Sequence, residues 1–217
     1  MSDIKYGRYA TFLEAVYKDV DLMCAFRKEC EAQGIPIIKK DTAILLFNLL
    51  NVKAPHRLLE IGSAAGYSSI FMANAFPSVD ITTYENSKKR ADICKENIIR
   101  FKMQDRITLI EEDAFLALKD EEEKYPFIFL DAAKGQYINM LKDIKRILSL
   151  GGILVSDNLF FGGDTLESRY FVKRRDRTIH ARLREYIRAI TTDDELISQI
   201  LPVGDGVSVS YKRDKNG

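Results

Sequence analysis

The chain has 217 residues, 46% of them hydrophobic and 30% charged, which is ordinary for a globular protein of one domain. Cys24, Cys30 and Cys94 are odd in number and lack a C-x-x-C spacing, which argues against a disulfide framework and against zinc. The N-terminus has no signal-peptide core, and the longest apolar stretch, Ala43 to Leu50, is too short to span a bilayer. We therefore expect a cytoplasmic, single-domain protein over residues 1–217 with no membrane partner.

Two helices are predicted before the first strand. Apolar residues recur at helical spacing from Tyr6 to Cys30, and a glycine and a proline then end the pattern. Asp41 is suited to N-cap a second helix over Thr42 to Leu50. Residues 1–52 are therefore expected to form a helical cover, either on a sheet or between two copies of the chain.

Strand and helix patterns alternate after residue 56. The predicted strands are Arg57 to Ile61, Val79 to Tyr84, Ile107 to Ile110, Phe127 to Leu130, Gly152 to Ser156, Leu196 to Leu201 and Val207 to Tyr211. The predicted helices between them are Tyr67 to Ala75, Ser87 to Phe101, a short one after Asp113, Gln136 to Leu148 and an arginine-rich one. This alternation predicts a doubly wound, Rossmann-like α/β fold with a mostly parallel sheet. The last two strands are joined by only five residues, so they must form an antiparallel C-terminal hairpin.

The chain is organised around the turn that follows the first strand. In Leu58-Leu-Glu-Ile-Gly-Ser-Ala-Ala-Gly-Tyr-Ser68, an apolar run stops at a glycine and a helical pattern begins. Gly62 and Gly66 allow a tight turn and a close approach of the backbone to a ligand at the helix N-terminus. Glu60 precedes the turn, and Glu85 ends the next strand, where an acid can accept both hydroxyls of a ribose. A single G-x-x-x-G fits the adenosine of S-adenosylmethionine better than NAD, although such a turn can also serve only to pack a helix on a strand.

Acidic side chains end two later strands. Asp131 follows Phe127-Ile-Phe-Leu, and Asp157 and Asn158 follow Gly152-Ile-Leu-Val-Ser. These strand ends are expected to be neighbours, where two carboxylates would repel each other unless a cation joined them. Oxygen ligands of this kind favour Mg²⁺. The alternative is that Asp131 caps a helix and Asp157 forms a turn.

Lys134 follows Asp131 by three residues, on the turn that opens the next helix. A fully protonated lysine is a poor base, but a neighbouring metal ion and partial burial both disfavour the ammonium form. We therefore interpret Lys134 as a candidate general base. Without the metal, an exposed lysine at a helix start is nearly as good an interpretation.

Four motifs together resemble the metal-dependent, catechol-type O-methyltransferase family over nearly the whole chain. They are Glu60-Ile-Gly-Ser-Ala-Ala-Gly-Tyr-Ser, Asp131-Ala-Ala-Lys-Gly-Gln-Tyr, Asp157-Asn-Leu-Phe-Phe-Gly-Gly and Pro202-Val-Gly-Asp-Gly. The resemblance implies a class I methyltransferase sheet and Mg²⁺ bound by Asp131, Asp157 and Asn158. It implies Lys134 as the proton acceptor. It assigns S-adenosylmethionine to Ile38, Glu60, Gly62, Ser68, Glu85, Asp113, Ala114 and Asp131. Ser63 stands where many relatives have threonine, which leaves the backbone turn intact.

An arginine-rich segment makes the resemblance more specific to one group within this family. Residues 169–188 carry a net charge of +6, while the rest of the chain sums to −5. Within the family the sequence is most similar to bacterial tRNA 5-hydroxyuridine methyltransferases, through this segment, Gly34-Ile-Pro-Ile-Ile and the Asp131 motif. The similarity implies a tRNA anticodon loop as partner, bound through Lys173, Arg174, Arg175 and Arg177, and a homodimer. A charged segment of this kind can also be a solvated or dimer-facing helix.

Three functions are therefore weighed from the sequence. The first is methylation of 5-hydroxyuridine to 5-methoxyuridine at the tRNA wobble position. The second keeps the chemistry and uses a small catechol-like phenol or a coenzyme A ester. The third is a non-catalytic RNA-binding or nucleotide-binding protein, which would have no use for Asp131, Asp157, Asn158 and Lys134 together. A dehydrogenase is disfavoured because the G-x-G-x-x-G turn is missing.

Overall fold

The computed structural model of the chain describes residues 11–12, 15–16 and 23–214. The strands are β1 (Arg57–Ile61), β2 (Asp80–Tyr84), β3 (Ile107–Ile110), β4 (Tyr125–Leu130), β5 (Leu148–Ser156), β6 (Leu196–Leu201) and β7 (Val207–Lys212). The α-helices are α2 (Cys24–Ala32), α3 (Lys40–Lys53), α4 (Tyr67–Ala75), α5 (Lys88–Arg100), α6 (Ala114–Ala117), α7 (Tyr137–Ile147) and α8 (Arg177–Thr191). Two 3₁₀ helices, η1 (Lys134–Gln136) and η2 (Phe161–Leu166), follow β4 and β5. Among the described helices, none is long and apolar enough to cross a bilayer.

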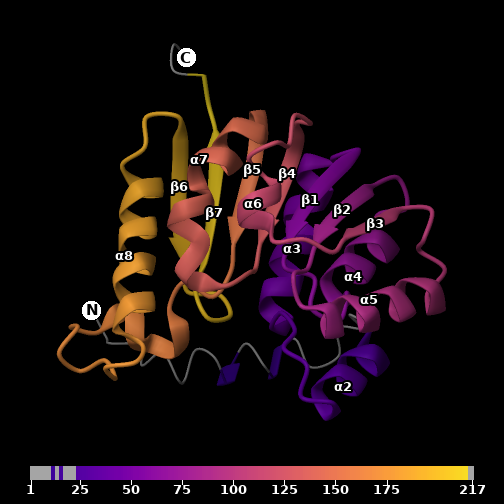
Figure 1. Cartoon of the computed structure of the whole chain (residues 1–217), viewed down its shortest axis with the longest axis horizontal. Coiled ribbons are helices and arrows are strands. Elements are labelled where there is room, and N and C mark those ends of the chain that lie inside the picture. The colour runs from indigo at the N-terminus through magenta and orange to yellow at the C-terminus, as the bar shows by residue number, and fades with distance from the viewer. Residues whose placement is uncertain (1–10, 13–14, 17–22, 215–217) are drawn as a thin grey trace.

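The seven strands form one sheet in the order β3-β2-β1-β4-β5-β7-β6. The first five run parallel, and β7 pairs antiparallel with both β5 and β6. The predicted doubly wound fold with an antiparallel C-terminal hairpin is thus confirmed (Figure 1). Because the chain order reverses between β1 and β4, the carboxyl ends of these strands face an open crevice at the switch point.

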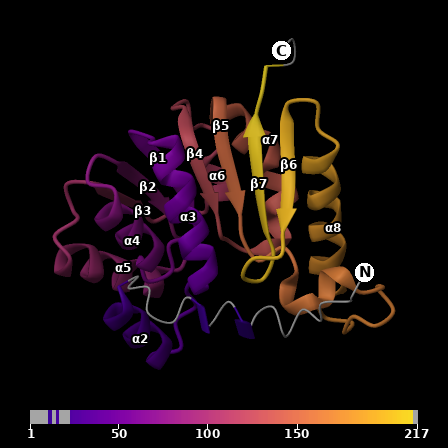
Figure 2. The same ribbon diagram turned by 180° about the vertical axis from the view of Figure 1, so that it is seen from behind.

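Helices cover both faces of the sheet (Figures 1 and 2). Alternate residues of each central strand point to opposite sides, so Leu58 and Phe127 pack under α2 to α5, whereas Leu59 and Ile128 pack against α6 to α8. Both faces are therefore apolar. This explains why the central strands are nearly continuous hydrophobic runs rather than alternating ones.

The N-terminal predictions need two corrections. Much of the expected helix from Tyr6 to Cys30 lies outside the described residues, and residues 11–12 and 15–16 are helical as predicted. The helix is not continuous, however, because Met23 adopts a left-handed conformation with φ 56° and α2 begins at Cys24. Asp41 is not the N-cap of α3, since Lys39 occupies that position and Asp41 lies in the first turn. The Asp41 carboxylate instead accepts hydrogen bonds from the backbone N–H groups of Gly204, at 2.7 Å, and Thr42, at 3.0 Å. It thereby ties α3 to the β6–β7 turn.

Candidate functional site

The turn after β1 brings two backbone segments into contact. Gly62 has φ +103°, and a Cβ atom there would lie 2.2 Å from the carbonyl oxygen of Asp131. The N–H groups of Gly62 and Ser63 both donate to the carbonyl of Tyr84, at 3.0 and 3.1 Å. The tight turn expected from the sequence is present, but the close neighbour of Gly62 is the backbone that follows β4. Gly62 therefore sets the distance between the two strand ends that frame the site.

Gly62→Ala is expected to destabilise the fold by about 2 kcal/mol more than Gly163→Ala does, because overpacking adds to the backbone strain. Gly163 is a matched control, since it has φ +99° and nothing within 4 Å of the Cβ that would be added. Thermal unfolding of both variants gives the comparison. Equal stability of the two would show that the Asp131 backbone moves aside freely.

Glu60 lies beneath the turn rather than at the pocket surface. Its side chain is fully buried and accepts hydrogen bonds from the hydroxyls of Ser68, Ser69 and Thr83, the last at 2.7 Å. Burial raises the pKa of this carboxyl to about 7. Glu60 was predicted to bind the cosubstrate, but the structure gives it a positioning role, because it orients Ser68 on the first turn of α4.

Glu85, just after β2, is held by two backbone N–H groups. One carboxylate oxygen accepts from the N–H of Ala64 at 3.0 Å and the other accepts from the N–H of Ser87 at 2.9 Å. The side chain is thus fixed, and it still lines the pocket. Each oxygen retains a lone pair, so two adjacent hydroxyls can be bound at once.

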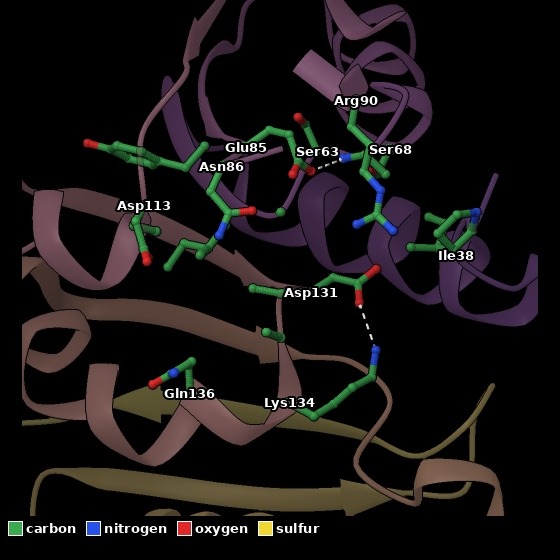
Figure 3. A pocket seen from close by; sticks show the side chains of 18 of the residues that line it. Ile38, Ser63, Ser68, Glu85, Asn86, Arg90, Asp113, Asp131, Lys134 and Gln136 are labelled. Atoms are coloured by element: carbon green, nitrogen blue, oxygen red, sulfur yellow. Dashed lines mark hydrogen bonds and ion pairs between the residues drawn. The ribbon is translucent and has the colours of Figure 1, made fainter. Parts of the chain in front are cut away.

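A pocket of about 420 Å³ opens beside these residues, at the carboxyl ends of β1, β2 and β4. Figure 3 shows the side chains that line it. The predicted residues found in its lining are Ile38, Gly62, Ser68, Glu85, Asp113, Ala114, Asp131 and Lys134. Sequence reasoning missed Asn86, Arg90 and Gln136, which also line it. Asn86 and Arg90 closely follow Glu85 in the chain, and that proximity was the one signal available for them.

The acids after β4 and β5 are neighbours, as predicted. Leu130 and Ser156 are paired in register, and the N–H of Asp157 donates to the carbonyl of Leu130 at 3.0 Å. The hydroxyl of Tyr137 lies 3.3 Å from the Leu130 carbonyl and 3.1 Å from that of Asp157. Asp131 and Asp157 are therefore held side by side at the carboxyl ends of β4 and β5.

This pair of carboxyls is electrostatically frustrated. Burial raises the pKa of Asp131, and burial together with the charge of Asp131 raises the pKa of Asp157 to about 8. The ammonium of Lys134 lies 3.9 Å from Asp131, and Figure 3 shows this ion pair as a dashed line. Two hard carboxylates that repel each other fit a divalent cation, with the amide oxygen of Asn158 as a third donor. Within the described part of the chain no three His, Cys, Asp or Glu side chains form a metal-binding group, so the Mg²⁺ site stays a prediction.

The predicted tRNA-binding residues lie outside the pocket lining. Lys173, Arg174 and Arg175 are exposed in the loop before α8, so the arginine-rich helix predicted from the sequence includes only the later part of the basic segment, from Arg177. Arg177 donates from its Nε to the carbonyl of Val172 at 3.1 Å. Arg182 on α8 donates to the carbonyl of Gly135 at 3.0 Å, which packs this helix against the turn that carries Lys134.

Comparison with known proteins identifies the family. The sequence profile of the O-methyltransferase family matches residues 15–213, nearly the whole chain. The chain belongs to this family. The caffeoyl-CoA O-methyltransferase of Populus kitakamiensis is 25% identical over 183 residues, covering 81% of this chain and 77% of the relative. Tapetum-specific methyltransferase 1 of Arabidopsis thaliana is 25% identical over 181 residues, covering 81% and 76%.

Solved structures of methyltransferases share the fold. The SAH-bound methyltransferase PaMTH1 of Podospora anserina superposes with a TM-score of 0.82 at 24% identity, covering 99% of this chain and 97% of that one. An O-methyltransferase from Bacillus cereus in complex with SAH gives 0.77 at 21% identity, covering 94% and 96%. The predicted methyltransferase sheet is thereby confirmed.

Proposed function

We propose that this O-methyltransferase family member transfers the methyl group of S-adenosylmethionine to a hydroxyl whose neighbouring atom carries a second oxygen. The observation that supports the proposal is that one pocket is lined by both Glu85 and the Asp131–Lys134 pair. The first is suited to a ribose and the second to proton transfer. In addition, the two SAH-bound proteins share the fold of this chain.

Asp131, Asp157 and Asn158 would hold Mg²⁺. When bound, the ion would acidify the acceptor hydroxyl and orient it through its two adjacent oxygens. Asp131 contributes to both halves of the site, because its backbone packs on Gly62 and its side chain faces Lys134. Lys134, as the neutral amine, would take the hydroxyl proton while the oxygen attacks the methyl carbon and the sulfur keeps the electron pair of the broken bond.

Two acceptor classes meet the requirement for adjacent oxygens. The caffeoyl-CoA relative favours a small catechol-like phenol or a coenzyme A ester. One observation favours 5-hydroxyuridine in a tRNA anticodon loop over a small phenol: exposed cations precede the helix that packs against the Lys134 turn. A small phenol has no need of these cations, whereas the phosphates of a tRNA and those of a coenzyme A ester are both attracted to them, so the acceptor assay has to separate these two.

The acceptor is decided by supplying purified protein with S-adenosylmethionine, Mg²⁺ and each acceptor in turn. The acceptors are catechol, caffeoyl-CoA, tRNA that contains 5-hydroxyuridine, and the same tRNA with uridine. We expect methylation only where two adjacent oxygens are offered, so uridine tRNA should stay unmodified. Efficient turnover of catechol or caffeoyl-CoA without turnover of the modified tRNA would establish the small-molecule function. Methylation of uridine tRNA would contradict the chelation requirement.

A further inference from the structure

Residues 167–175, between η2 and α8, form an aromatic-basic loop. Tyr170 and Phe171 are 87% and 81% exposed, the highest values for any aromatic side chain of the described residues. Arg169, Lys173, Arg174 and Arg175 are exposed around them, and Glu167 is the one acid in the loop. Leaving both rings exposed loses the free energy that their burial would contribute to folding. An exposed aromatic pair of this kind therefore indicates a contact with another molecule.

The loop is held in place by bonds at both ends. His180 Nε2 lies 3.1 Å from the carbonyl of Glu167, and the N–H of Phe171 donates to the carbonyl of Ser168 at 2.9 Å. Val172 is buried, and its carbonyl accepts from Arg177. The two rings are therefore presented outward from an anchored backbone, which lowers the entropy lost on binding.

The position of the loop connects it with the proposed acceptor site. Its anchors, His180 and Arg177, belong to the first turns of α8, and Arg182 on the next turn bonds to Gly135 beside Lys134. In Figures 1 and 2 the loop lies at the same end of the sheet as the start of α7. A long acceptor whose reactive group reaches Lys134 would thus extend toward the loop.

The charge of the loop selects its partner. Arg169, Lys173, Arg174 and Arg175 outnumber Glu167 and the adjoining Asp176, which pairs with Arg175 at 3.4 Å. This excess of positive charge would repel the same face of a second copy of the chain, whereas it attracts a polyanion. Aromatic rings among cations suit unpaired nucleobases, because the rings stack on bases and the cations contact phosphates. We propose that Tyr170 and Phe171 stack on unpaired bases of an RNA that Arg169, Lys173, Arg174 and Arg175 hold by its phosphates. This inference rests on the tRNA candidate of the proposed function.

Fluorescence anisotropy with two labelled RNAs tests the inference. One is a 17-nucleotide anticodon stem-loop, and the other is a blunt duplex with the same number of phosphates but no unpaired bases. The double variant Tyr170→Ala, Phe171→Ala should weaken stem-loop binding by at least about tenfold, leaving duplex affinity unchanged. Arg174→Ala, Arg175→Ala should weaken both RNAs and reduce the slope of log Kd against log salt by roughly 0.7 to 0.9 for each lost contact.

Matched variants separate stacking from other effects. Tyr211→Ala, on β7 and 48% exposed, should leave both RNAs bound as before. Tyr170→Phe, Phe171→Tyr keeps both rings and should retain stem-loop affinity. Binding of SAH to every variant checks that the fold and the pocket are intact.

Several results would overturn the inference. One is an unchanged stem-loop affinity in the aromatic variant, and another is an equal loss for stem-loop and duplex. If the protein binds vesicles of phosphatidylserine and phosphatidylcholine and loses this binding in the aromatic variant, the two rings contact a membrane instead. If light scattering shows a dimer for the unaltered protein and a monomer for the aromatic variant, the partner of the two rings is a second copy of the chain. If the unaltered protein binds neither RNA, the tRNA candidate of the proposed function fails. If the protein binds RNA equally well with and without the two rings, only the stacking inference fails.

Discussion

Lys134→Ala is expected to lower kcat by about 10² to 10⁴-fold while leaving the affinity for SAH nearly unchanged, because a positioned base acts on the chemical step. The ammonium of Lys134 lies 3.9 Å from Asp131 on the turn that opens η1, and the side chain lines the pocket, where it can receive a proton. Lys134→Arg should not restore the rate, since a guanidinium stays protonated. Turnover assays and calorimetric titration with SAH measure the two quantities.

The pH dependence distinguishes a base from a structural lysine. As the pH rises above the pKa of the acceptor hydroxyl, the acceptor loses its proton to solvent and no longer needs Lys134. The defect of Lys134→Ala should therefore shrink at high pH. Lys142→Ala, an exposed lysine on the adjoining helix α7, is the control and should turn over normally at every pH. A rate equal to that of the unaltered protein in both Lys134 variants would leave this lysine without a catalytic role.

Asp157→Ala is expected to abolish turnover and Mg²⁺ binding while SAH still binds, because Asp157 does not line the pocket that contains Glu85 and Asp131. Excess EDTA should abolish turnover in the unaltered protein, and added Mg²⁺ should restore it. Titration with Mg²⁺ and with SAH separates the two ligands. Full turnover in excess EDTA would contradict the metal site.

Stability gives a second readout for Asp157. Its pKa in the folded protein, about 8, is above the usual value of 3.8, so the folded state binds this proton more tightly than the unfolded state does. Without metal, this group therefore makes the fold less stable as the pH rises from about 4 to about 8, and the loss is complete above that window. Asp157→Asn removes the charge. In the metal-free state the variant should therefore melt at a higher temperature than the unaltered protein at pH 8, and this difference should be smaller at pH 5. A metal-free protein that melts identically with Asp or Asn at pH 8 would show that the two carboxylates are not in conflict.

The sequence by itself determined the order of strands and helices and the acidic residues that end the strands. Apolar runs such as Phe127 to Leu130 predict buried strands because both faces of a parallel sheet are covered, and the five-residue link before Val207 can only be a hairpin turn. Since parallel strands end at the same edge of their sheet, the acids at the strand ends could be expected to gather there. That Asp131 and Asp157 are neighbours was thus within reach of sequence reasoning.

Tertiary structure alone decided what each polar group contacts. Glu60 and Glu85 both stand at strand ends in the sequence, yet one is enclosed by three hydroxyls and the other faces the pocket. Asp41 has the sequence position of a helix cap but bonds to Gly204, 163 residues away. The helical pattern of the basic segment gave no sign that Lys173 to Arg175 precede α8 in a loop. Local spacing determines periodicity and burial, whereas hydrogen-bond partners depend on strand order and register, which arise from contacts between residues distant in the chain.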